Sequence, residues 1–107
     1  MSELPKPYRR FGEQYAAIYQ AYEGLGVTIA TVSCLDQKTR ELIKLGMAAA
    51  CKSESAVHSH THRALEAGAT PQEVEHAILL GITTLGFPTT MAALTWAKDA
   101  IEDHLKK

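Results

Sequence analysis

Helix-start signals recur along this chain with short stretches between them, and they constrain its fold more than any other feature. The clearest is TPQE at residues 70–73, which places a threonine before a proline at the first helical position and a glutamate at the third. This arrangement is a capping box, in which threonine and glutamate satisfy backbone N–H groups at the start of a helix. Asp36 and Ser53 precede further apolar residues at helical spacing and can cap helices in the same way. The chain is therefore predicted to be all-α.

These signals, with the glycines and prolines between them, predict the bounds of five helices. We expect helices over residues 8–23, 37–50, 53–68, 70–86 and 88–104. Gly24 and Gly26 are predicted to end the first helix. Residues 25–35 are rich in β-branched side chains but have no second strand to pair with, so they form a loop or another short helical piece. Short loops between amphipathic helices then predict one compact domain over residues 1–107, with about five to six helices.

Small residues are used heavily after residue 36, as in GMAAA at 46–50 and TTMAAL at 89–94. Alanine and glycine let helices approach closely, but each buries little apolar area. A chain of 107 residues also buries only about two-thirds of the surface that its unfolded form exposes. We therefore expect the chain to gain stability as a homo-oligomer. A sparse but adequate monomer core is the alternative.

Charge and cysteine content narrow the expected partners and compartment. The formal net charge is -1 and charged residues are scattered, so neither a nucleic acid nor a membrane surface is an expected partner. The apolar runs are shorter than the ~20 residues that cross a bilayer, and the N-terminal segment lacks the apolar stretch of a secretory signal. With only two cysteines, Cys34 and Cys51, we expect free thiols and a cytoplasmic protein.

Three histidines alternate at positions 58, 60 and 62. At about 100° per residue, His60 is predicted to lie at the centre of an apolar arc, with His58 and His62 on the polar face. The residues of this arc are Ala56, Val57, Ala64 and Ala67. A half-buried imidazole must satisfy its ring nitrogens, either by bonding a backbone carbonyl in the core or by working with a charged group in proton transfer.

Glu41 is the candidate partner of His60. It falls between Leu45 and Ala48, at the margin of the apolar face of its helix. A carboxylate there could orient the imidazole, as an aspartate does in a catalytic triad. The alternative is a glutamate at the edge of its helix, paired with a neighbouring lysine or arginine.

Metal and thiol chemistry need more groups than the sequence places together. His58 and His62 lie about one helical turn apart and could hold zinc or nickel, but a complete site needs three or four ligands, so no metal is predicted. Cys51 has no second cysteine three residues on, and Cys34 is the only other thiol that could resolve it. A lone cysteine is typical of an inert thiol, with a redox role as the alternative.

Three segments carry a resemblance to a known family. They are LDQKTRELIKLGMAAA (35–50), HTHRALEAGATPQEVEHAILLGI (60–82) and GFPTTMAALTWAKDAIED (86–103). Over residues 36–102 the chain resembles the carboxymuconolactone decarboxylase and alkyl hydroperoxidase D family. The resemblance implies an all-α subunit that assembles into trimers or hexameric rings.

The hydroperoxidase branch of this family combines a glutamate and a histidine with two cysteines that perform peroxide and disulfide chemistry. Aligned with this sequence, the glutamate and histidine positions fall on Glu41 and His60, and the cysteine positions fall on Ser53 and Ala56. Both redox residues of the branch are therefore absent. A peroxidase or disulfide oxidoreductase that uses Cys51 is the alternative that this branch implies.

The decarboxylase branch, which lacks the cysteine pair, is more similar to this chain. It implies a small enzyme that acts without a cofactor on a carboxylated small molecule. His60 would be the proton donor, Glu41 its orienting partner, and Arg63 an anchor for a substrate carboxylate. The branch commonly has arginine two residues after the histidine, where this chain has His62. A non-catalytic oligomeric binding protein that retains the fold is a further alternative.

Overall fold

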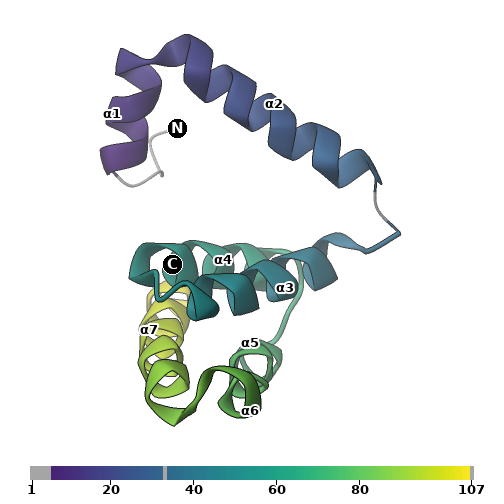
Figure 1. Cartoon of the computed structure of the whole chain (residues 1–107), viewed down its shortest axis with the longest axis vertical. Helices are drawn as coiled ribbons and strands as arrows, with labels where there is room; N and C mark the ends of the chain where they lie inside the picture. Colours follow the sequence, from purple (N-terminus) through teal and green to yellow (C-terminus); the bar gives the residue numbers. More distant parts are fainter. Residues whose placement is uncertain (1–5, 33, 107) are drawn as a thin grey trace. The chain divides into compact units, whose positions relative to one another are not determined.

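The computed structural model describes residues 6–32 and 34–106, and these residues form seven helical segments and no strand (Figure 1). The segments are α1 (Lys6–Gln14), α2 (Ala16–Val32), α3 (Gln37–Ala50), α4 (Glu54–Glu66), α5 (Pro71–Leu79), α6 (Ile82–Leu85) and α7 (Phe87–Leu105). The all-α prediction is confirmed. Contacts divide the chain into two units, Met1–Cys34 and Leu35–Lys107, while a single domain over the whole chain stays a prediction. No helix in the described part of the chain is long and apolar enough to cross a membrane.

The first unit consists of α1 and α2, which meet at Tyr15. Its ring contacts that of Phe11, with the two ring centroids 5.3 Å apart. Helix α2 continues through Gly24 and Gly26 to Val32, so the helix end predicted at these glycines is wrong. Neither glycine adopts a positive φ, and a glycine costs a helix only about 1 kcal/mol relative to alanine. Of the two alternatives for residues 25–35, a loop or a helical piece, the structure shows a helix as far as Val32.

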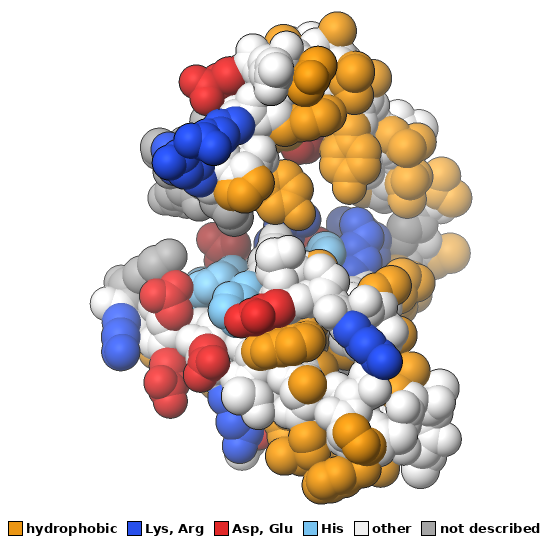
Figure 2. Space-filling view, turned by 60° about the vertical axis from the view of Figure 1, so that its left-hand side comes forward, with side chains coloured by type: hydrophobic (Ala, Val, Ile, Leu, Met, Phe, Trp, Pro, Cys, Tyr) orange, Lys and Arg blue, Asp and Glu red, His pale blue; other side chains and the backbone are white. Residues whose placement is uncertain are grey.

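Helix α2 carries a stripe of exposed apolar side chains, which we call the α2 stripe. Its members are Ile18, Tyr22, Leu25, Ile29 and Val32. They fall within about 80° of each other around the helix axis, and their exposed fractions lie between 55% and 82%. No described residue of α1 or α2 is buried, and hydrophobic side chains cover much of this unit in Figure 2. The unit thus has no core of its own.

The second unit packs the α3–α4 hairpin against α7 and α5. The eleven residues of its core cluster are Leu45, Ala48, Ala49, Val57, Ala64, Ala69, Val74, Ile78, Ala93, Ala97 and Ile101. Six of the eleven are alanine, so the helices lie close together while each contact removes little apolar area from water.

Capping side chains start α3 and α5 where the sequence predicted. Asp36 accepts a hydrogen bond from the Thr39 N–H at 2.8 Å, and α3 has the predicted bounds. At the start of α5, Thr70 Oγ1 accepts from the Glu73 N–H at 3.1 Å, and the Glu73 carboxylate accepts from the Thr70 N–H at 2.9 Å. This backbone hydrogen bond, followed by the bond from Lys38 at 3.0 Å, lowers the pKa of the Glu73 carboxyl. The capping box is therefore complete.

The helix predicted over residues 70–86 is interrupted, which corrects the sequence analysis. Helix α5 ends early, and the single turn α6 follows before α7 begins. A Cβ atom at Gly81 would lie only 3.3 Å from Oγ1 of Thr90 in α7, so the backbone passes close to α7 at the interruption. Gly86 has a φ of 93°, a left-handed conformation that favours glycine, and it turns the chain from α6 into α7.

Thr70→Ala is expected to lower the free energy of unfolding by about 1 kcal/mol, because the variant loses the side-chain acceptor of the capping box. Urea unfolding followed by circular dichroism measures the change. Thr70→Ser is the matched control, since serine retains the hydroxyl acceptor and should stay close to the parent. An equal loss in both variants would contradict the assignment of this stability to the cap.

Candidate functional site

Helices α3 and α4 bring Glu41 and His60 into contact, and we call these residues the Glu–His pair. Glu41 Oε1 lies 2.8 Å from His60 Nδ1. The two side chains are only 13% and 19% exposed. An ionised carboxylate can only accept, so Nδ1 carries the proton, which fixes the ring orientation and leaves Nε2 for a ligand. The contact thus holds the imidazole in a fixed orientation, which is an arrangement that suits a histidine to proton transfer.

A short turn positions the pair. Residues 51–53 join α3 to α4, and Lys52 takes a positive φ of 56° within this turn. Ser53 caps α4 as predicted, and its Oγ accepts from the Ala56 N–H at 3.3 Å. The two helices are therefore antiparallel, so Glu41 of α3 faces His60 of α4, which lies 19 residues later in the sequence.

His60 lies at the edge of the buried face of α4 and not at its centre, which corrects the predicted apolar arc. The buried residues of this helix are Val57, Thr61 and Ala64. Ala56 and Ala67 are only partly buried. Thr61 is fully buried at the far side of this face, about 100° from His60, although its hydroxyl forms no hydrogen bond with the described residues. The predicted arc left Thr61 out and was therefore displaced toward His60. An edge position leaves the His60 ring accessible from one side.

His62, which was predicted on the polar face of α4, is partly buried and contacts two polar side chains of α7. Its Nδ1 lies 3.0 Å from Nδ1 of His104, and its Nε2 lies 3.4 Å from Oδ2 of Asp103. His58 is partly buried as well. Sequence reasoning missed this cluster because 42 residues separate the two histidines and no local pattern connects them. No group of three or more His, Cys, Asp and Glu side chains in the described ranges is arranged to hold a metal ion.

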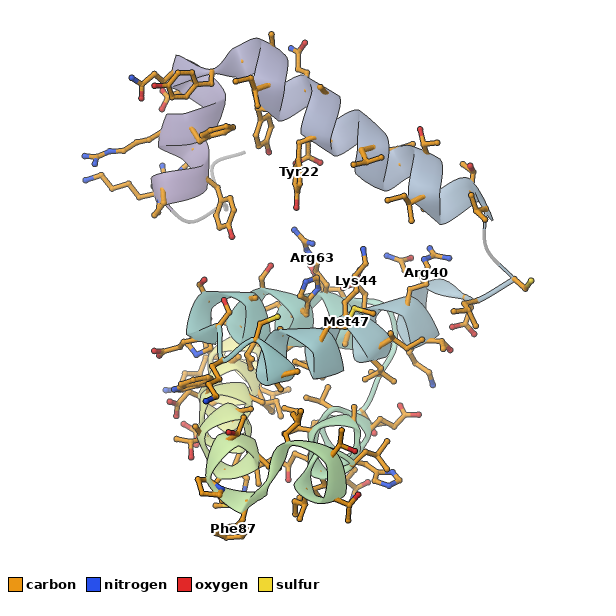
Figure 3. All side chains as sticks on the ribbon, viewed as in Figure 1. Tyr22, Arg40, Lys44, Met47, Arg63 and Phe87 are labelled. Carbon is orange, nitrogen blue, oxygen red and sulfur yellow. The ribbon has the colours of Figure 1, made fainter. Side chains whose placement is uncertain are left out.

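Arg63, the predicted substrate anchor, is exposed on α4 about one turn beyond His60. Figure 3 shows its side chain projecting from the same side of the α3–α4 hairpin as Lys44. The structure therefore brings Glu41 and His60 together and leaves Arg63 nearby at the surface, while the roles of all three stay predictions.

The two cysteines are exposed free thiols. Cys51 follows the last residue of α3, and Cys34 belongs to the other unit. A redox role for Cys51 therefore stays an alternative that needs a direct test.

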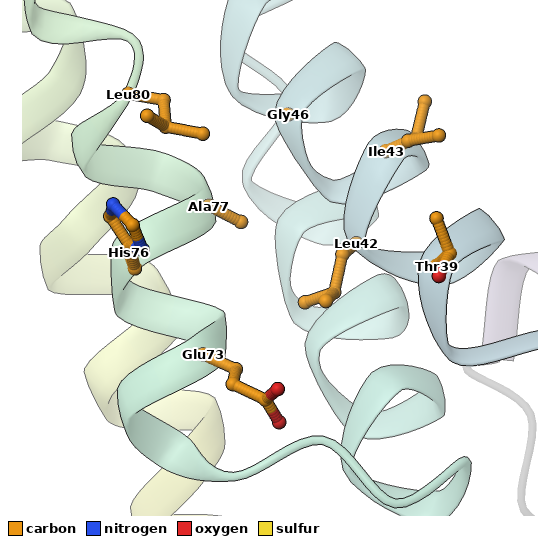
Figure 4. Close-up of a pocket in the computed structure, with 8 residues that line it drawn as sticks. All are labelled: Thr39, Leu42, Ile43, Gly46, Glu73, His76, Ala77 and Leu80. Atoms are coloured by element: carbon orange, nitrogen blue, oxygen red, sulfur yellow. The ribbon is translucent and has the colours of Figure 1, made fainter.

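An apolar groove of about 440 Å³ lies between α3 and α5, apart from the Glu–His pair (Figure 4). The residues that line it are Thr39, Leu42, Ile43, Gly46, Glu73, His76, Ala77 and Leu80. Glu73 is already bonded to the helix start and to a lysine, so the groove offers few polar groups to orient a reacting molecule.

Two curated relatives are similar to this chain in sequence. An uncharacterized protein of Haemophilus influenzae is 40% identical over 63 residues, which cover 59% of this chain and 56% of that protein. The chain thus spans just over half the length of that relative. An uncharacterized protein of Methanocaldococcus jannaschii is 30% identical over 83 residues, which cover 77% of this chain and 80% of that protein.

A solved structure and a family model identify the family. The crystal structure of a protein from Burkholderia xenovorans LB400, provisionally named carboxymuconolactone decarboxylase, is similar with a TM-score of 0.75 and 27% identity, covering 99% of this chain and 85% of that one. The model of the carboxymuconolactone decarboxylase family matches residues 15–99, a range that includes both members of the Glu–His pair. This protein therefore belongs to the carboxymuconolactone decarboxylase family.

Proposed function

We propose that this protein is a small, cofactor-free lyase that removes carbon dioxide from a carboxylated, conjugated small molecule. The observation that carries the proposal is the 2.8 Å contact between Glu41 and His60. A half-buried imidazole with an oriented carboxylate is a common device for proton transfer near neutral pH. The family match and the provisional name of the Burkholderia protein support decarboxylation as the reaction class.

In the proposed reaction, the carbon–carbon bond to a substrate carboxylate breaks and carbon dioxide leaves. The bonding electrons move into the conjugated carbonyl group and form an enolate. Nε2 of protonated His60 then donates its proton to the enolate carbon, and water restores the proton on the ring. Glu41 holds Nδ1–H throughout, which keeps Nε2 in one direction and stabilises the imidazolium. Arg63 binds a carboxylate of the substrate through its guanidinium group.

Thiol chemistry is the alternative, and it depends on Cys51 as an exposed free thiol. Ser53 and Ala56 occupy the positions of the paired cysteines in the hydroperoxidase branch. Ser53 serves as the N-cap of α4, and a serine cannot enter disulfide exchange. A peroxidase that used Cys51 would therefore need a mechanism different from that of the two-cysteine members.

An activity screen tests the proposal and separates it from the alternatives. The full chain is incubated with a panel of carboxylated lactones that carry a conjugated carbonyl group, and released carbon dioxide is measured without added metal or thiol. We expect turnover of at least one member, and the same rate for Cys51→Ser. A rate that falls with Cys51→Ser, or peroxide consumption by the parent, would favour thiol chemistry. No turnover of any member would favour a binding protein.

We also propose that the working form is a cytoplasmic homo-oligomer, a trimer or hexamer. The α2 stripe supports this proposal, because five large apolar side chains in water are unfavourable unless a second surface covers them.

A further inference from the structure

Two cations beside the Glu–His pair have no partner among the described residues. Lys44 and Arg63 form no hydrogen bond and no ion pair there. Other cations of α3 are engaged: Lys38 pairs with a glutamate of α5 at 3.0 Å, and Arg40 donates to a backbone carbonyl at 2.6 Å. The positive charge of Lys44 and Arg63 is thus available to an anion.

Helical spacing places one of these cations on each side of the Glu–His pair. Lys44 follows Glu41 by three residues on α3, and Arg63 follows His60 by three residues on α4. Each step moves the backbone about 4.5 Å along its helix. Because the two helices of the hairpin are antiparallel, the step from Glu41 to Lys44 and the step from His60 to Arg63 run in opposite directions along it. The Cα atoms of Lys44 and Arg63 are therefore about 9 Å apart along the hairpin, with the Cα atoms of the pair between them.

Both cations lie on the outer side of the hairpin. Lys44 and Arg63 are exposed, and Figure 3 shows both side chains projecting from the same side of α3 and α4. The His60 ring is only 19% exposed. A ligand that approaches this side meets the two charges first, and its middle then lies nearest to the imidazole.

We infer that Lys44 is a second anion-binding residue of this site and that, together with Arg63, it selects ligands that carry two anionic groups. Lysine and arginine are long and flexible, so their charged ends can converge on the two carboxylates of one small diacid. A diacid held at both ends presents the carbon chain between its carboxylates to His60. This inference rests on the proposed function, because it concerns ligands that lie over the same imidazole.

Titration calorimetry of the full chain at low salt tests the inference with two acids of equal carbon number. Glutarate carries two carboxylates and pentanoate carries one. We expect glutarate to bind the parent about tenfold more tightly than pentanoate, as one additional charge-assisted contact implies. Lys44→Met should remove this difference, and Lys44→Arg should keep most of it. Lys98→Met changes an exposed lysine of α7 and should leave both affinities unchanged.

Three results would overturn the role of Lys44. They are equal affinity of the parent for both acids, no measurable binding of either acid at millimolar concentration, and equal losses in Lys44→Met and Lys98→Met. Failure of the proposed function has a different signature, in which glutarate binds in a Lys44-dependent manner but no lactone is decarboxylated. His60→Gln should retain glutarate binding, which separates anion binding from proton transfer.

Discussion

His60→Gln is expected to lower kcat by a factor of about 10²–10⁴ on any carboxylated substrate that the parent consumes, which is the usual contribution of a positioned general acid. Glutamine has no titratable group, so the enolate would have to take its proton from water. In the proposed reaction the cations bind the substrate, so its affinity should change little. Steady-state kinetics on one substrate of the panel would therefore show a fall in kcat with KM close to that of the parent.

Glu41→Gln should give a smaller loss than His60→Gln. The amide oxygen can still accept from Nδ1 of His60 and keep the ring oriented, but the negative charge that stabilises the imidazolium is gone. The double variant should be no worse than His60→Gln alone, because Glu41 acts through the ring.

His76→Gln is the matched control for these variants, because it makes the same substitution at an exposed histidine of α5. Helix content and molecular mass must be measured for every variant. Removing His60 leaves the 13% exposed carboxylate of Glu41 without its partner, and this costs about 1–3 kcal/mol of stability. Kinetics are therefore compared well below the unfolding temperature of each variant. A folded, assembled His60→Gln protein with the turnover of the parent would contradict the proposed role of His60.

Local signals predicted some elements and failed at others for a physical reason. The start of α3 at Asp36 and the capping box at Thr70 depend on groups within three residues, so the sequence alone predicts them. Gly24 and Gly26 were misread as a helix end because both keep a helical backbone within α2, whereas Gly86 takes a positive φ where the chain turns. The conformation of such a glycine depends on where the next helix packs, and a local sequence pattern carries no information about that packing.

The contact between Glu41 and His60 was predictable in its residues but not in its geometry. Helical spacing and the family resemblance both pointed to Glu41 and His60, but neither could show that their side chains are 2.8 Å apart. Spacing also placed His60 at the centre of the buried face of α4, because burial there is decided by packing against α3 and α7, and this packing buries Thr61 as well. The contact between His62 and His104 exists only once α7 has folded back on α4.

Replacing Leu25 and Ile29 together by aspartate is expected to weaken the proposed homo-oligomer about 100-fold or more, since charges would then enter a desolvated interface. Both residues belong to the α2 stripe, and they are 58% and 55% exposed. Fully burying a leucine or isoleucine side chain contributes about 1.5–3 kcal/mol, so the stripe as a whole favours association strongly. Light scattering after size-exclusion chromatography, over a range of protein concentrations, measures the mass of each form.

Val27→Asp is the control that makes this test specific. Val27 is 66% exposed on the same helix, but it lies on the side opposite the α2 stripe. The substitution also places a charged aspartate, a poor helix former, on α2, so the assembly should persist if the stripe is the interface. Equal dissociation by Val27→Asp and by the double variant would mean that α2 is destabilised as a helix. A parent that is monomeric at every concentration would contradict the homo-oligomer itself. No partner copy would then cover the five apolar side chains of the α2 stripe.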